Sequence, residues 1–133
     1  MNVIIANNNK QLLDSLDVDV IKNLEGNYTS DEIIQLFSNF FFNKMFLDIT
    51  AVNDYKNIVE IQKISKKLPV DKIIFLLNDE LLNNQLYISN LINLGIYNFT
   101  TNKEGLIYLT SKILEEIDIN SLRRIFKKIE RGV

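Results

Sequence analysis

The stretch at residues 44–50, Lys-Met-Phe-Leu-Asp-Ile-Thr, constrains the fold of this chain most. It combines four apolar residues with one carboxylate, contains no turn-forming residue, and lies between two helical patterns. An apolar run bounded by helices is typical of a central parallel strand, because helices cover both faces of a parallel sheet. Its carboxylate, Asp48, therefore falls near the carboxyl end of a strand, where open α/β sheets bind ligands.

The rest of the chain predicts four more strands, each followed by a helical pattern. They fall at residues 3–6, 18–22, 73–77 and 96–100, so the order is strand then helix, five times over. This alternation indicates a parallel sheet with helices on both faces. The third and fourth strands are the most apolar, and the more polar second and fifth suit the edges of the sheet. We therefore predict a flavodoxin-like α/β fold with a five-stranded parallel sheet in the order 2-1-3-4-5.

The helix boundaries follow from capping and stop signals. Thr29 and Glu32 form a predicted capping box, and Leu68-Pro69 and Gly95 mark two helix ends. The predicted helices start near residue 10, at Thr29, at Asn53-Asp54, after the polar stretch 78–85, and at Thr101-Asn102. The second is expected to present an apolar face of Ile33, Ile34, Phe37, Phe40 and Phe41.

Composition excludes several kinds of chemistry. The 133 residues include no cysteine and no histidine, which removes disulfides, thiolate nucleophiles, the usual zinc ligands and the usual general base. No apolar run is long enough to cross a membrane, and we see no signal peptide. We expect a cytoplasmic protein.

Charge divides the chain unevenly. Residues 1–119 carry ten lysines against sixteen acids, whereas residues 120–133 carry five basic residues against one acid. The sequence thus predicts an acidic body, residues 1–117, and a basic C-terminal extension, residues 118–133.

Two segments resemble the receiver domains of response regulators. Phe46-Leu47-Asp48-Ile49 is similar to the end of the receiver's third strand, whose aspartate accepts a phosphoryl group. The segment from Gly95 to Asn102 is similar to the Gly-Ala-x-x-Tyr-x-x-Lys segment of receivers. The chain looks closer still to the degenerate receivers at the front of ParA/MinD-type ATPases linked to pilus assembly and conjugation.

The resemblance implies a phosphorylation site whose other members are replaced. Asn7 and Asn8 stand where receivers carry the acid pair that holds Mg²⁺, and Leu77 stands where a Thr or Ser steadies the phosphoryl group. Asn102 stands where the conserved lysine would lie, with Lys103 adjacent. Phosphoryl transfer depends on charge placed around the transferring group, so we predict no catalysis, no metal and no cofactor.

We interpret Asp48 as a retained polar residue that accepts hydrogen bonds from Asn7 or Asn8. Neutral donors alone would then balance its desolvation, so we expect Asp48→Asn to leave stability unchanged or to raise it. The alternative is a working phosphoacceptor in which Lys103 replaces the missing lysine. A flavin-binding electron carrier would need a phosphate-cradling loop after the first strand, and that loop is absent.

We predict a protein-interaction module, with a homodimer or a ParA/MinD-type ATPase domain as its partner. The resemblance implies a surface formed by the fourth helix, fifth strand and fifth helix. The basic extension repeats apolar residues at helical spacing, which favours protein contact; a membrane surface or a link to a further domain stays open, and nucleic acid is less favoured. The candidate contact residues are Leu86, Tyr87, Leu91, Tyr97, Phe99, Tyr108, Leu122, Ile125, Phe126 and Ile129.

Overall fold

Five parallel strands form one sheet in the order β2-β1-β3-β4-β5. The computed structural model describes residues 1–111. The strands are β1 (Asn2–Ala6), β2 (Val20–Glu25), β3 (Lys44–Asp48), β4 (Ile73–Leu76) and β5 (Phe99–Thr100). The strand order confirms the predicted flavodoxin-like fold, and it places β3 at the centre of the sheet.

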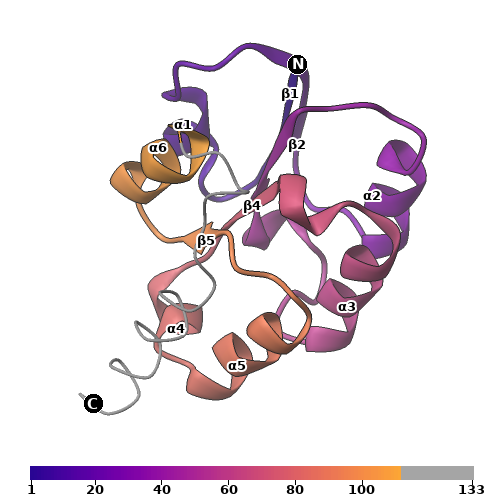
Figure 1. Ribbon diagram of the computed structural model, residues 1–133, viewed down its shortest axis with the longest axis vertical. Coiled ribbons are helices and arrows are strands. Elements are labelled where there is room, and N and C mark those ends of the chain that lie inside the picture. The colour runs from indigo at the N-terminus through magenta and orange to yellow at the C-terminus, as the bar shows by residue number, and fades with distance from the viewer. Residues whose placement is uncertain (112–133) are drawn as a thin grey trace.

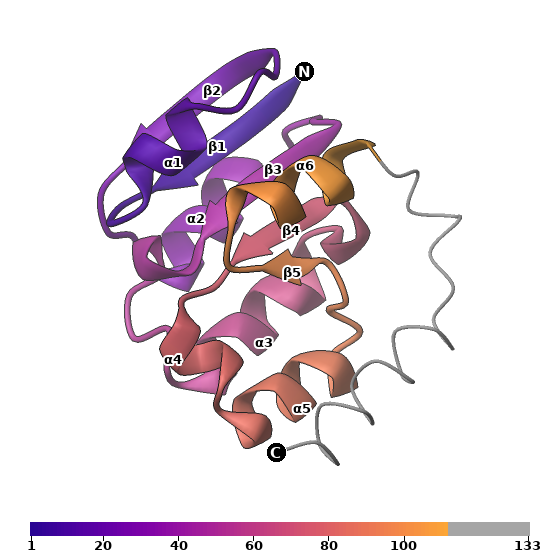
Figure 2. The same ribbon diagram turned by 90° about the vertical axis from the view of Figure 1, so that its left-hand side faces the viewer.

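Helices cover both faces of this sheet. Figure 1 shows α1 (Lys10–Asp14) and α6 (Lys103–Ser111) on one side of the strands, with α2 (Ser30–Phe37) and α3 (Ile58–Lys67) on the other. Two further helices, α4 (Asp79–Leu82) and α5 (Gln85–Asn93), follow β4. Figure 2 shows β5 at the end of the sheet, with α6 on one side of it and α5 on the other.

The strands divide the core into two layers, because successive side chains of a strand point to opposite faces. Val3, Ile5, Met45 and Leu47 pack under α2, α3 and α5 in the larger core cluster. Their neighbours along the strands pack under α1 and α6 in a smaller cluster that includes Ile4, Ala6, Phe46, Leu13, Leu106 and Leu109. The α1/α6 face therefore has the thinner cover.

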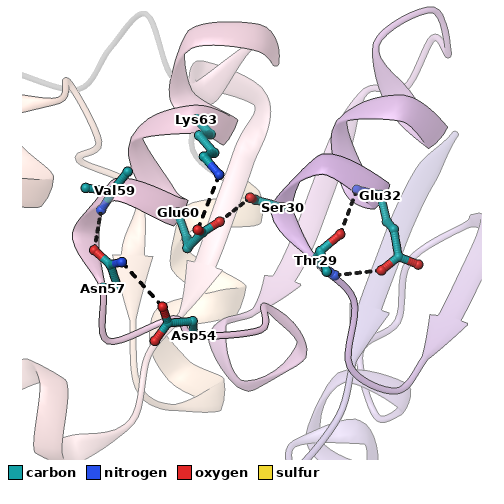
Figure 3. Close-up of polar contacts among 8 residues, drawn as sticks. All are labelled: Thr29, Ser30, Glu32, Asp54, Asn57, Val59, Glu60 and Lys63. Carbon is teal, nitrogen blue, oxygen red and sulfur yellow. Dashed lines mark hydrogen bonds and ion pairs between the residues drawn. The ribbon is translucent and has the colours of Figure 1, made fainter.

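Polar contacts fix the starts of α2 and α3 and join the two helices (Figure 3). The predicted capping box is confirmed: Glu32 N–H donates to Thr29 Oγ1 (3.1 Å) and Thr29 N–H donates to Glu32 Oε1 (3.0 Å). The buried Ser30 hydroxyl donates to the Glu60 carboxylate of α3. This hydrogen bond, with a smaller effect from Lys63, lowers the pKa of Glu60.

The two edge strands differ from their predicted bounds. β2 runs from Val20 to Glu25 instead of 18–22, because its pairing with β1 continues until Gly26 turns the chain at a φ of 126°. β5 contains only Phe99–Thr100 instead of 96–100, although the Asn98 carbonyl still accepts from Phe75 N–H (2.9 Å).

The prediction that α2 extends to Phe41 is wrong. The helix ends at Phe37, and Phe40 and Phe42 turn back to pack edge-to-face on its ring, with centroids 5.5 and 6.3 Å away. Phe41 is left 63% exposed, with the Lys72 ammonium 4.8 Å from its ring centroid. The aromatic cluster is thus helix packing with one exposed member.

Two later helix starts also differ. α3 begins at Ile58, capped by Asn57, because Asp54 adopts a φ of 58° that a right-handed helix cannot contain. The stretch 78–85, predicted as a polar lead to one helix, forms α4 and the start of α5. Asn78 caps the first by accepting from Leu81 N–H (2.9 Å), and Asn84 caps the second by accepting from Tyr87 N–H (3.1 Å).

Candidate functional site

Asp48 ends β3 at the centre of the sheet and is completely buried. Oδ2 accepts from the backbone N–H groups of Asn7 (3.0 Å) and Asn9 (2.8 Å). Oδ1 accepts from Thr50 N–H (3.0 Å), the Thr50 hydroxyl (2.8 Å) and the Asn9 side-chain amide (3.1 Å). The carboxylate therefore ties the end of β1 to the end of β3.

Five donors leave this carboxylate no open acceptor site. An ionised carboxyl group has about four lone-pair positions, and here both oxygens are saturated and shielded from water. All five donors are neutral, and none of the ion pairs within residues 1–111 includes Asp48. To attack a phosphorus atom, Asp48 would first have to break several of these bonds.

Neither the Asn7 nor the Asn8 side-chain amide donates a hydrogen bond to Asp48. The Asn7 side-chain amide donates to the Thr50 carbonyl (2.9 Å), which also accepts from Asn27 Nδ2 (3.2 Å). Asn8 is exposed, and its backbone N–H donates to Thr50 Oγ1 (3.0 Å). Of the two predicted donors to Asp48, only Asn7 contacts it, and through its backbone.

Asn9 and Thr50 are the Asp48 partners that sequence reasoning missed. Thr50 follows Asp48 by two residues, the spacing at which an aspartate accepts from the backbone in an Asx-turn. That spacing was a usable signal. By accepting from Thr50 N–H, Asp48 caps the short 3₁₀-helix η1 (Ile49–Ala51). Asn9 gave no such signal, because 39 residues separate it from Asp48.

The other candidate pocket residues do not contact Asp48. Leu77 is buried in the larger core cluster with Phe75, and it offers no polar group. Asn102 caps α6 by accepting from Gly105 N–H (2.8 Å). Lys103 is exposed and lines a groove beside residues 15–18. No group of three or more acidic residues within residues 1–111 is placed to hold a metal ion.

The candidate contact residues divide between surface and core. Leu86 and Tyr108 are 72% and 55% exposed, and Tyr97 and Phe99 are partly buried. Tyr87 and Leu91 are core residues, so their assignment to a contact surface is wrong.

The buried Tyr87 side chain has a hydrogen-bond partner, since its hydroxyl donates to the Tyr55 carbonyl (2.6 Å). Burial raises the pKa of this phenol.

The four candidates on the basic extension, Leu122, Ile125, Phe126 and Ile129, lie outside the described residues.

Comparison with known proteins does not assign a family. No family model, no curated protein and no solved structure matches this chain. Within residues 1–111 no helix is long and apolar enough to cross a bilayer.

Proposed function

We propose that this protein is a pseudo-receiver: a non-catalytic module with a receiver-like fold that acts by docking another protein. The observation that carries the proposal is the state of Asp48. It stands where a receiver's phosphoacceptor would stand, yet both of its oxygens are buried and occupied by neutral donors of the same chain. The carboxylate acts as a structural link between two strand ends.

The surroundings of Asp48 also lack the charges that phosphoryl transfer needs. A loose transition state is stabilised by metal ions and cations around the transferring oxygens. In the described part of the chain, Asn7 and Asn8 supply no carboxylate, and Lys103 makes no ion pair with Asp48. A neutral amide oxygen is a weaker ligand for Mg²⁺ than the carboxylates that usually bind this ion.

The docking surface that we propose lies on α4, α5, β5 and α6. Large apolar side chains stand in solvent there: Leu82, Leu86, Ile107 and Tyr108 are between 39% and 72% exposed. β5 is an edge strand, so one side of its backbone is open to pairing or must be covered. These features favour a second copy of the chain as the first partner to test, in a regulatory homodimer. The resemblance adds a ParA/MinD-type ATPase domain as a candidate.

Exposure to a small phosphodonor tests the non-catalytic part of the proposal. The full chain is incubated with Mg²⁺ and an acyl phosphate, and its intact mass is measured. We expect no phosphoryl adduct, because no lone pair of Asp48 is free to attack. A stoichiometric adduct that disappears in Asp48→Asn but persists in Asp54→Asn would establish the alternative, a phosphoacceptor switch through Asp48.

A further inference from the structure

The charges of the described residues differ between the two ends of the strands. All five strands run in the same direction (Figure 2), so the segments that precede them gather at one end of the sheet and those that follow them at the other. Five lysines and three carboxylates lie in the preceding segments, residues 1–2, 15–22, 38–44, 66–73 and 94–98. Three lysines and nine carboxylates lie in the following segments and first helical turns, residues 7–10, 25–32, 48–60, 77–80 and 101–104. The end where the strands begin is therefore basic, and the end where they finish is acidic.

Two exposed apolar side chains stand at the basic end. Phe41, in the segment between α2 and β3, is 63% exposed, and Met1 is 46% exposed. Asn43 N–H donates to the Met1 carbonyl (2.7 Å), so the two apolar residues lie on neighbouring segments. They form an apolar tip at an otherwise basic end of the molecule.

Four lysines accompany this apolar tip. The Lys72 ammonium lies 4.8 Å from the centroid of the Phe41 ring. Lys44 and Lys72 each precede one of the paired residues that begin the register of β3 and β4, so their backbones lie side by side. Two more lysines, Lys66 and Lys67, are exposed in the last turn of α3. We call this group the amino-end patch: Met1, Phe41, Lys44, Lys66, Lys67 and Lys72.

The four lysines of the amino-end patch are not neutralised by carboxylates. None of the ion pairs within residues 1–111 includes them. Asp71, in the short 3₁₀-helix η2 (Val70–Lys72), is the one carboxylate in residues 1, 41–44 and 66–72, and Asp19 near β1 already pairs with the amino terminus (3.6 Å). Like charges at adjacent strand starts repel, and a facing anionic surface would relieve this repulsion.

The acidic end of the molecule does not cancel this attraction. The central strand β3 has five residues, so the two ends are about 15 Å apart at about 3.3 Å per residue. That distance is about twice the Debye length of ~8 Å at physiological ionic strength. A surface that touches the basic end is therefore largely screened from the acidic one.

We infer that the amino-end patch binds the surface of an anionic lipid bilayer, with Phe41 inserted between the headgroups and the lysines against their phosphates and carboxylates. Inserted apolar side chains together with lysines attracted to anionic lipids are the means by which proteins bind a bilayer surface. Two apolar side chains are too few for the core of a protein interface, which buries about 800 Å² per partner. Lys72 already covers one face of the Phe41 ring, which disfavours stacking on a nucleobase.

This surface uses neither Asp48 nor the β5 edge, so the inference stands or falls separately from the proposed function. Tryptophan fluorescence of the full chain tests it, because the chain contains no tryptophan and Phe41→Trp introduces a single reporter. Vesicles of phosphatidylcholine with phosphatidylserine should shift its emission to the blue, and acyl-chain-brominated lipids should quench it. Vesicles of phosphatidylcholine alone should do neither.

The matched reporter is Val59→Trp, at a 47% exposed position in the first turn of α3 and thus at the acidic end. Its emission should stay unchanged with either kind of vesicle. Vesicle binding that leaves the Phe41→Trp emission unchanged would place the contact elsewhere on the chain and overturn the inference. A Phe41→Trp signal that responds to a single-stranded oligonucleotide but not to vesicles would overturn the bilayer as the partner and identify nucleic acid instead.

Vesicle co-sedimentation of charge variants supplies a second, independent measurement. One triple variant removes patch lysines, and the other removes the same charge from the acidic end: Lys44→Gln/Lys67→Gln/Lys72→Gln and Lys10→Gln/Lys56→Gln/Lys103→Gln. We expect the patch triple to weaken binding about a hundredfold, at about fivefold per lysine, and the other triple to weaken it less than about threefold. Phe41→Ser should weaken binding about tenfold, whereas Val59→Ser should not. Equal affinities of the two triples, or full binding by Phe41→Ser, would each refute the inference.

Discussion

At the scale of a single residue, Asp48 shows how a buried carboxylate is accommodated without a cation. Three backbone N–H groups, one hydroxyl and one amide donate to it. Hydrogen bonds to a charged acceptor are each worth more than neutral ones, which offsets the desolvation of the carboxylate. This geometry reverses the expectation that Asp48→Asn would be neutral or stabilising.

We predict that Asp48→Asn lowers the free energy of unfolding by about 2–4 kcal/mol, because an amide nitrogen would face buried N–H donors and leave them unsatisfied. Denaturant unfolding of the full chain measures the change. The matched control is Asp54→Asn, at an exposed position whose positive φ asparagine tolerates, and it should stay within about 0.5 kcal/mol. An unchanged midpoint and slope for Asp48→Asn would contradict the structural role.

At the scale of elements, the start of α6 approaches β5 at a glycine. A Cβ on Gly105 would lie 1.9 Å from Thr100 Oγ1 and 2.7 Å from Thr100 Cβ. Real atoms do not approach so closely, and the second atom is fixed to the β5 backbone. The missing side chain at residue 105 therefore allows α6 to lie against the strand end and to form the wall of the groove.

Gly105→Ala should destabilise the protein by about 1–3 kcal/mol through this overlap, although alanine is the better helix former. Thermal and denaturant melts measure the loss. Glu104→Ala, on the adjacent exposed residue of the same helix, provides the control and should change stability by less than about 0.5 kcal/mol. Equal stability of Gly105→Ala and the parent chain would show that α6 can shift away from β5 at no cost.

At the scale of the whole molecule, exposed apolar side chains lie on many elements, and one group of them lies beside β5. Leu82, Leu86, Ile107 and Tyr108 belong to the elements that flank that edge, whereas the others are spread over the N-terminus, β2, α2, the segment after α2, and α3: Met1, Ile21, Leu36, Phe41 and Val59. The group beside β5 gives the proposed dimer a preferred side. β2, the opposite edge, carries Lys22 and Glu25, whose charges disfavour strand pairing.

We therefore expect sedimentation velocity to show concentration-dependent self-association of the full chain. Leu86→Glu, at a position 72% exposed, should weaken it about tenfold or more without loss of stability. Leu36→Glu, at an exposed position on α2, which does not flank β5, should leave association unchanged and serves as the control. A parent chain that stays monomeric at all concentrations would remove the homodimer from the proposal and leave a different protein as the partner.

The sequence by itself determined the fold. Apolar runs marked β1, β3 and β4, and polar composition placed β2 and β5 at the edges, because burial on both faces requires apolar side chains throughout a strand. Thr29, Leu68 and Gly95 marked three helix boundaries, since their effects act within one turn of backbone. Asp48 was located near the end of the central strand because it follows the apolar run that marks this strand.

Only the tertiary structure decided what Asp48 contacts and which side chains remain exposed. The donors from Asn7 and Asn9 come from residues about forty positions away, and no local pattern specifies such a meeting. Leu86 and Tyr87 are neighbours and Leu86 is the more hydrophobic, yet Tyr87 is in the core and Leu86 faces solvent. That choice depends on how α5 is rotated against the sheet, and packing across the whole core fixes this rotation.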